Sequence, residues 1–251
     1  MSRRDSPAAP TESLGQTIAR LRSYQKPNKG APAYSRFVNR PLGRVIAAAA
    51  YRRGLTPNGV TAISGTLSLV AIVVLFATTP GWGVAVAVTL LLVLGYAFDS
   101  ADGQLARLQG GGSAAGEWLD HVVDCAKINL LHLSVFVGLT RTDLVGFWRG
   151  LPLAYVAMAN IFFFTFILGD LLKRTKAAPA PAATGHASVL RSLLTVPTDY
   201  GLLCLVFLLW GAPAVFAAVY GLLLLGNAAY LALGLPKWFR DVKALDALGP
   251  R

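Results

Sequence analysis

Four aspartates between residues 99 and 124 have the residue type and spacing of a metal site. Asp99 and Asp102 lie three residues apart, and Asp120 and Asp124 lie four residues apart, so each pair shares one face of a helix. Carboxylates that meet in one pocket repel each other unless a cation lies between them. Carboxylate oxygens are hard ligands, and no cluster of histidine or cysteine accompanies them. The pattern predicts a site for Mg²⁺ or Mn²⁺.

The residues beside these aspartates suit a phosphate-bearing substrate. Gly103, Ala106 and Gly116 lack bulk on the same helix faces and leave room for a nucleotide close to the backbone. Arg107 can donate charge-assisted hydrogen bonds to a phosphate. One or two divalent ions would neutralise a pyrophosphate and stabilise an in-line phosphoryl displacement. The segment therefore predicts phosphoryl-transfer chemistry.

The sequence that must position these residues predicts membrane helices. Hydrophobic residues make up 55% of the 251 residues, charged residues only 14%, and the mean hydropathy is +0.55. Apolar runs of about 20 residues, the length that crosses a bilayer as a helix, recur along the chain. We expect an all-α membrane protein with six transmembrane helices, at about residues 57–77, 83–109, 113–139, 151–172, 198–210 and 213–235.

The turn between the second and third of these helices decides whether the aspartates meet. Gly110, Gly111 and Gly112 end the second helix, and Ser113 can cap the third, so the two helices form an antiparallel hairpin. The faces that carry the aspartates can then lie opposite each other near the turn. Counting about 20 residues from the far end of the second helix places them close to the membrane surface. We expect one water-accessible pocket there.

Composition divides the rest of the chain. Residues 1–32 are rich in Ser, Pro, Ala and basic residues without periodicity, which predicts a disordered basic tail. In residues 33–53, Arg36, Arg40 and Arg44 recur every fourth residue among apolar ones, which predicts an amphipathic juxtamembrane helix. A solvated linker is the alternative. The expected domains are the tail at 1–32, a membrane domain at 33–235 and a C-terminal cytoplasmic tail at 236–251.

The basic excess fits a membrane topology better than nucleic-acid binding. The formal net charge is +11, and eleven of the 23 Lys and Arg residues precede residue 54. The loops expected on the outer side, 78–82, 140–150 and 211–213, carry only Arg141 and Arg149. By the positive-inside rule, we expect a multi-pass protein of the cell membrane with both termini and the aspartate pocket in the cytoplasm. We expect no nucleic-acid partner, because the basic residues of a nucleic-acid-binding protein would gather on one face, whereas these lie in alternate loops.

Residues 99–124, which read DSADGQLARLQGGGSAAGEWLDHVVD, also form a recognisable signature. The segment resembles the signature of the CDP-alcohol phosphatidyltransferase (CDP-alcohol phosphotransferase) family, and all eight fixed positions match at their expected spacing. The stretch 54–58 and the number of helices resemble the family as well. The matching positions are Asp99, Asp102, Gly103, Ala106, Arg107, Gly116, Asp120 and Asp124.

The resemblance implies roles for these positions. Asp99, Asp102 and Asp120 would ligate the divalent metals, and Asp124 would contribute to that site and act as the base towards the acceptor hydroxyl. The small residues and Arg107 would shape the CDP pocket. Members of this family typically use CDP-diacylglycerol as donor, release CMP in phospholipid biosynthesis and assemble as homodimers. The residues by themselves support the metal cluster and phosphate binding but leave the nucleotide open.

A small polar acceptor that carries its own phosphate would need cations beside the site. Lys173, Arg174 and Arg191 lie on the same side of the membrane as the aspartates, as in family members that use inositol phosphate or glycerol phosphate. The alternative is that these residues serve only the positive-inside rule. Lys127, near Asp124, is expected to be an internal counter-ion of the carboxylates. A polyol phosphate is the acceptor that we expect.

Two functions besides a transferase remain open from the residues: a transporter, and a catalytically silent assembly factor that binds metal and nucleotide without transfer. Carboxylates inside a membrane also mark ion paths, so a cation or proton transporter is possible. A transporter would need polar groups that continue to the outer face, whereas 84–94 and 130–139 are almost wholly apolar. A water-soluble CDP-polyol could also replace the lipid donor.

Overall fold

A computed structural model describes residues 12–24, 32–176 and 195–248, and all of its regular elements are helical. The helices that precede the spans are α1 (Leu14–Ser23), the π-helical turn η1 (Ser35–Asn39) and α2 (Arg40–Arg52). The long helices are α3 (Pro57–Ala77), α4 (Trp82–Leu108), α5 (Ala114–Thr140), α6 (Phe147–Lys176) and α9 (Pro213–Lys243). The short helices are η2 (Val196–Thr198), α8 (Tyr200–Val206), η3 (Phe207–Gly211) and η4 (Ala244–Leu248).

Five of these helices, α3, α4, α5, α6 and α9, are long and apolar enough to cross a membrane. The predicted fifth span corresponds to a shorter apolar segment, Tyr200–Gly211, in which α8 continues as the 3-10 helix η3. The all-α membrane fold is confirmed, and the predicted count of six includes this shorter segment. The chain is a multi-pass membrane protein.

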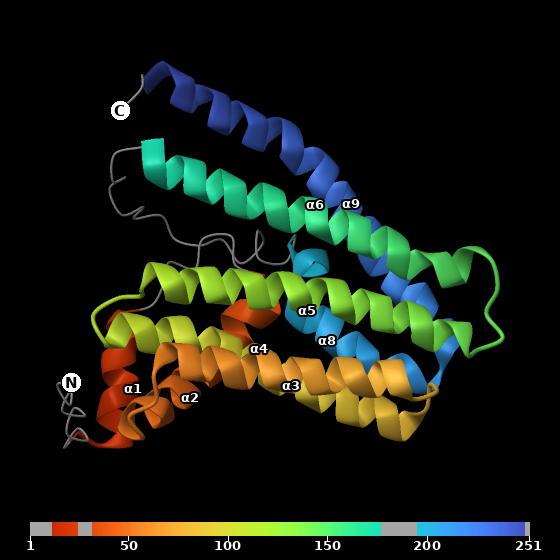
Figure 1. Ribbon diagram of the computed structural model, residues 1–251, viewed down its shortest axis with the longest axis horizontal. Helices are drawn as coiled ribbons and strands as arrows, with labels where there is room; N and C mark the ends of the chain where they lie inside the picture. The colour runs from red at the N-terminus through yellow and green to blue at the C-terminus, as the bar shows by residue number, and fades with distance from the viewer. Residues whose placement is uncertain (1–11, 25–31, 177–194, 249–251) are drawn as a thin grey trace, which may run out of the picture.

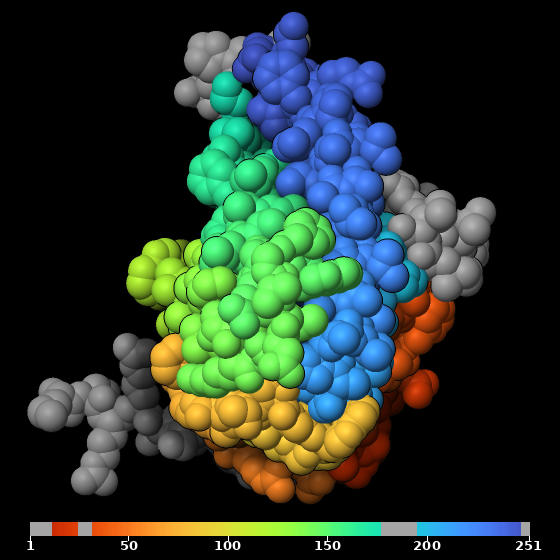
Figure 2. All heavy atoms as spheres, turned by 90° about the vertical axis from the view of Figure 1, so that its right-hand side faces the viewer, coloured from red at the N-terminus to blue at the C-terminus, as the bar shows by residue number. Residues whose placement is uncertain are grey.

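The helices are arranged in two groups (Figure 1). Helices α3, α4 and α5 lie side by side, and α1 and α2 lie at the end that carries the α4–α5 turn. Helix α6 packs against α5 and α9, and the C-terminal parts of α6 and α9 diverge together from the remaining helices. Figure 2 shows the opposite end, where the α3–α4 and α5–α6 connections and the start of α9 lie together.

The α4–α5 hairpin forms through the residues that the sequence singled out. Gly110 and Gly111 have φ angles of +100° and +123°, which only glycine adopts readily. The Gly111 amide donates a 2.9 Å hydrogen bond to the Ala106 oxygen, and this bond closes the end of α4. The Ser113 hydroxyl accepts a 3.0 Å hydrogen bond from the Gly116 amide and caps α5. The predicted antiparallel hairpin is confirmed.

The N-terminal tail departs from the prediction. Residues 1–32 were expected to be disordered, but Leu14–Ser23 form α1, which begins with a capping box between Ser13 and Gln16. Leu21 is fully buried in a cluster that also holds Ala47 and Ala48 of α2. Its burial against a distant segment supplies the stability that composition did not reveal. The prediction of a disordered tail is therefore wrong for this part of it.

The predicted juxtamembrane helix is present, with a local irregularity. The π-helical turn η1 passes directly into α2 at Arg40, one residue before Pro41. Phe37, Leu42 and Val45 are exposed among the basic residues of this segment, as an interfacial helix requires.

The C-terminal boundary also departs from the prediction. The tail was expected to begin at residue 236, but α9 continues through Pro236 to Lys243. The Trp238 ring packs edge-on against Phe162 of α6, with ring centroids 5.9 Å apart, and also contacts Tyr230. These aromatic contacts stabilise α9 against α6 beyond a proline that cannot donate a backbone hydrogen bond.

Asp199 joins two distant segments. One of its oxygens, Oδ2, accepts hydrogen bonds from the backbone amides of Tyr34 at 2.7 Å and Ser35 at 3.2 Å. The other oxygen accepts from the Gly201 amide at 3.1 Å and caps α8. Only 2% of Asp199 is exposed, so the carboxylate satisfies three amides in a buried position. It thereby ties the start of the juxtamembrane segment to α8.

Replacing Asp199 by Ala should destabilise the protein. The change leaves up to three backbone amides without an acceptor, at a cost of about 1–3 kcal/mol for a buried donor. Thermal unfolding in detergent should show a lower midpoint for Asp199→Ala than for the wild type. Asp143→Ala, at an exposed position in the α5–α6 connection, is the control. Equal midpoints for the two variants would contradict the assigned role.

Candidate functional site

The hairpin places the aspartates of α4 and α5 at the same depth. Asp99 lies nine residues before Leu108, and Asp124 lies ten residues after Ala114. At 1.5 Å per residue, both are about 14–15 Å from the turn. Because the helices are antiparallel, equal distances from the turn bring the two carboxylates level with each other.

Three of the four predicted carboxylates converge. Asp99, Asp120 and Asp124 each offer an oxygen, and these oxygens all lie within 4.8 Å of one another. All three residues are half-buried. Oxygens this close can share one cation, and a set made only of carboxylates suits the hard ions Mg²⁺ and Mn²⁺. We name these three residues the carboxylate cluster.

Asp102, the fourth predicted carboxylate, is not one of the three whose oxygens converge. It is 7% exposed, and its Oδ2 accepts a 2.7 Å hydrogen bond from the Thr61 hydroxyl of α3. Its Oδ1 accepts from the Gly103 amide at 2.5 Å. Thr61 was not identified from the sequence, since a single threonine in an apolar helix gives no signal. Its hydroxyl holds Asp102 in place and joins α3 to the signature.

Lys127 lies between two members of the cluster. Its Nζ is 2.6 Å from Asp99 Oδ1 and 2.7 Å from Asp124 Oδ1. Only 10% of the lysine side chain is exposed, so its charge is largely withdrawn from solvent. The predicted counter-ion is confirmed. A cation is therefore already present where two of the carboxylates approach each other.

The small residues of the signature lie in two different settings. A Cβ added to Gly103 would meet only Arg107 Nη1, at 3.5 Å, among the described residues, so the space above Gly103 is otherwise open. A Cβ on Gly116 would lie 2.9 Å from Asn58 Oδ1 at the start of α3. The Asn58 side chain would therefore have to shift to admit a larger residue at position 116. Ala106 is half-buried at the end of α4, next to Arg107.

The predicted acceptor cations are engaged by carboxylates. Arg174 Nη1 lies 2.5 Å from Glu117 Oε1, and the same guanidinium pairs with Asp170. Lys173 Nζ lies 3.7 Å from Asp241 Oδ2. Arg191 lies outside the described residues. Arg174 therefore joins the end of α6 to the start of α5, close in sequence to the carboxylate cluster.

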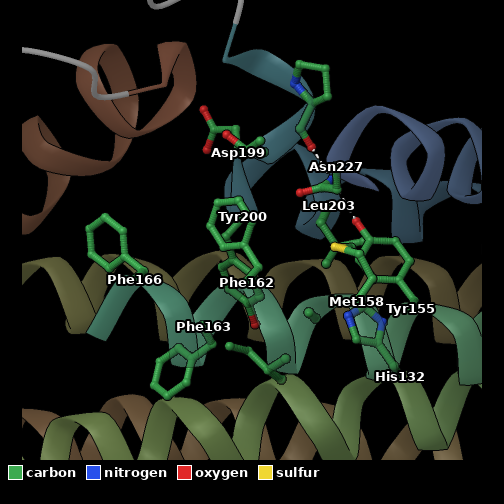
Figure 3. A pocket seen from close by; sticks show the side chains of 14 residues that line it. His132, Tyr155, Met158, Phe162, Phe163, Phe166, Asp199, Tyr200, Leu203 and Asn227 are labelled. Atoms are coloured by element: carbon green, nitrogen blue, oxygen red, sulfur yellow. Dashed lines mark hydrogen bonds between the residues drawn. The ribbon is translucent and has the colours of Figure 1, made fainter. Parts of the chain in front are cut away.

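A cavity of about 220 Å³ lies between α5, α6 and the segment around α8 (Figure 3). Phe162, Phe163 and Phe166 form an apolar side of its lining. Ile128, which also lines it, follows Asp124 by one helical turn on the same face of α5. Along α5 the lining of the cavity thus extends deeper than the carboxylate cluster, to Ile128 and His132. The sequence did not predict it, because its walls come from four separate segments.

Polar groups in this cavity bind one another. Asn227 donates hydrogen bonds to the Pro197 oxygen at 2.6 Å and to the Tyr155 hydroxyl at 3.1 Å. His132 stacks on Tyr155, and its Nδ1 lies 2.5 Å from the Tyr220 hydroxyl. These contacts give His132 a structural role, and they leave the apolar wall available to a ligand.

Comparison with known proteins agrees with the geometry. A family model described as CDP-alcohol phosphatidyltransferase matches residues 54–232, well over half of the chain. A phosphatidylinositol phosphate synthase from Mycolicibacterium smegmatis is 37% identical over 99 residues. That alignment covers 39% of this chain and 41% of the relative, so the chain spans about two fifths of the relative's length.

Two solved structures of a Mycobacterium tuberculosis phosphatidylinositol phosphate synthase are also similar, each 22% identical with a TM-score of 0.48. The structure in complex with manganese and citrate aligns over 77% of this chain and 87% of its own. The structure with CDP-DAG bound aligns over 80% and 94%. The signature, the hairpin that carries it and the match over residues 54–232 lead to one conclusion: this chain belongs to the CDP-alcohol phosphatidyltransferase family.

Proposed function

We propose that this protein transfers a phosphatidyl group from CDP-diacylglycerol to a hydroxyl of a phosphorylated polyol and releases CMP. The observation that carries the proposal is the carboxylate cluster, which lies within a complete family signature on a tight hairpin. Family membership supplies the reaction class. Inositol phosphate is the first acceptor to test, because a relative that is 37% identical over part of the chain bears the name phosphatidylinositol phosphate synthase.

The residues of the signature fit a divalent metal. Asp99, Asp120 and Asp124 would hold it, and their converging oxygens support this assignment. Asp102, which lies three residues after Asp99 on α4 and is oriented by Thr61, is proposed to complete the set of metal ligands. When bound, Mg²⁺ or Mn²⁺ would neutralise charge on the pyrophosphate and on the leaving CMP. Arg107, with Gly103, Ala106 and Gly116, is proposed to form the nucleotide site.

Asp124 is proposed as the base. It takes the proton of the acceptor hydroxyl as that oxygen forms a bond to the phosphorus of the phosphatidyl group. The bond between this phosphorus and the bridging oxygen of the pyrophosphate breaks, and CMP leaves with its electrons. The ion pair with Lys127 is made by Oδ1 of Asp124, which leaves Oδ2 to take the proton.

A lipid donor is favoured over a water-soluble CDP-polyol. The cavity beside the cluster has an apolar wall and extends deeper along α5 than the carboxylates. An acyl chain can bury there while the nucleotide stays near the α4–α5 turn. The signature and both termini would face the cytoplasm, since the basic residues gather at the ends of the membrane helices on the side that carries the signature. Assembly as a homodimer remains a proposal.

The acceptor phosphate is proposed to bind Lys173, Arg174 and Arg191. Arg174 supports this role because it extends from the end of α6 to Glu117 at the start of α5. More than half of its side chain is exposed, so an incoming phosphate can reach the guanidinium. A phosphate would then compete with Glu117 and Asp170 for the same donors.

Replacing Asp124 by Asn should abolish turnover while the protein still folds. Loss of a general base slows such a reaction by about 10²–10⁴-fold, and loss of a metal ligand adds to this. CMP release from CDP-diacylglycerol in the presence of Mg²⁺ measures the effect, with Asp143→Asn as the control. Undiminished activity in Asp124→Asn would remove the assignment of the base. Ion flux in proteoliposomes without CMP release would point instead to a transporter.

Replacing Lys127 by Met should increase the stabilisation that a divalent cation gives. In EDTA the variant leaves Asp99 and Asp124 without their shared counter-ion, at a cost of about 3 kcal/mol. Mg²⁺ should therefore raise the unfolding midpoint of Lys127→Met more than that of the wild type. Lys237→Met is the control, since it removes an exposed partner of Asp241, 2.8 Å away. Equal Mg²⁺ responses in all three proteins would contradict a metal at the carboxylate cluster.

A panel of acceptors should separate phosphorylated from unphosphorylated alcohols. With CDP-diacylglycerol as donor, mass spectrometry should detect products from inositol phosphate or glycerol phosphate in preference to free inositol or serine. Replacing Arg174 by Ala should raise KM for the phosphorylated acceptor about tenfold, the loss expected for one charged hydrogen bond, without changing KM for the donor. Lys243→Ala, which removes an exposed cation near the end of α9, is the control. A preference for serine would reject the polyol phosphate.

A further inference from the structure

The C-terminal end of α1 contacts Arg107, one of the eight signature residues. Arg107 Nε donates a 2.7 Å hydrogen bond to the backbone oxygen of Tyr24, the C-cap residue of α1. The two residues are 83 positions apart in the sequence. The family match begins only at residue 54, so α1 precedes the matched region. A segment outside that region thus touches the proposed nucleotide site.

The contact suits both partners electrostatically. The last carbonyls of a helix lack intrahelical donors and form its negative end, which favours a cation. A guanidinium carries five N–H donors in a rigid fork, and the bond to Tyr24 uses only the one on Nε. Arg107 Nη1 lies over Gly103, 3.5 Å from where a Cβ would stand. The guanidinium is therefore fixed above the bare backbone of Gly103.

Helix α1 is itself anchored to the body of the protein. Leu21 is fully buried in a cluster that includes Ala47 of α2 and Leu105 of α4, two residues before Arg107. The Arg20 guanidinium lies over the Tyr51 ring, 5.2 Å from its centroid. These contacts fix the position of the Tyr24 carbonyl relative to the end of α4. The hydrogen bond from Arg107 is consequently made to a carbonyl that is held in place.

We propose that α1 is a positioning element of the nucleotide site. By accepting a hydrogen bond from Nε, it holds the Arg107 guanidinium in one orientation and leaves both Nη groups for the pyrophosphate of the donor. A side chain that is fixed before binding loses less conformational freedom when the ligand arrives. This inference rests on the proposed transferase function, because it needs Arg107 to bind the donor phosphates.

Undocking α1 should weaken donor binding without slowing the chemical step. Leu21→Ala removes the buried anchor and should raise KM for CDP-diacylglycerol about three- to tenfold, the range for immobilising one long side chain. Because the lost interaction acts in the ground state and the transition state alike, kcat should stay within about twofold of the wild type. Arg22→Ala, an exposed position on the same helix, should leave both constants unchanged.

A double variant tests whether α1 acts through Arg107. Lysine at position 107 keeps the charge but loses the fork, so Arg107→Lys should raise KM on its own. Residues that act through one contact show non-additive effects, and Leu21→Ala should then raise KM no further in the Arg107→Lys background. The proposal would be overturned if the increase in KM for the double variant equalled the product of the increases for the two single variants. It would also be overturned if KM for Leu21→Ala equalled that for Arg22→Ala. If Leu21→Ala does not fold, Arg20→Ala, which loosens the same helix, takes its place in the cycle.

Binding of radiolabelled CDP separates this proposal from the proposed function. Equilibrium dialysis gives the dissociation constant of CDP for the wild type and for each variant, whether or not turnover occurs. If the wild type binds CDP but releases no CMP from any donor, the transferase function fails, and the same non-additivity in the dissociation constants still decides the role of α1. If the wild type does not bind CDP, both proposals fail.

Discussion

The mutual repulsion of the carboxylates is the constraint on which the rest of the site depends. Two unit charges about 4 Å apart interact by about 4 kcal/mol at the effective dielectric constant of a protein surface, and three carboxylate oxygens here lie within 4.8 Å of one another. Folding such a cluster therefore requires a compensating positive charge. Lys127 supplies it to Asp99 and Asp124 at 2.6 and 2.7 Å. A divalent cation can supply more, and to all three carboxylates.

That constraint explains why the hairpin is built so tightly. The carboxylates meet only if α4 and α5 keep their register, which Gly110 and Gly111 and the Ser113 cap fix at the turn. Asn58 then packs against Gly116, and Thr61 holds Asp102, so α3 supports the same register from a third side. At the other edge of the site, α1 reaches Arg107. Helices α3 and α1 thus each contribute a hydrogen bond that orients a signature residue.

The sequence predicted the features that are encoded locally. The hairpin, the Ser113 cap and the grouping of aspartates on two helix faces depend on residues a few positions apart. The features that it missed depend on distant partners. Asp199 binds amides 164 and 165 positions away, α9 passes Pro236 because Trp238 packs on α6, and α1 forms because Leu21 is buried against α2. The cavity beside the cluster likewise needs four segments to come together.

The most direct test of the central claim is anomalous X-ray diffraction from crystals grown with Mn²⁺. The account predicts a manganese peak within bonding distance of carboxylate oxygens from both α4 and α5, with Asp99, Asp120 and Asp124 among its ligands. A peak elsewhere on the protein, or none at saturating Mn²⁺ while Lys127 still bridges the carboxylates, would contradict it.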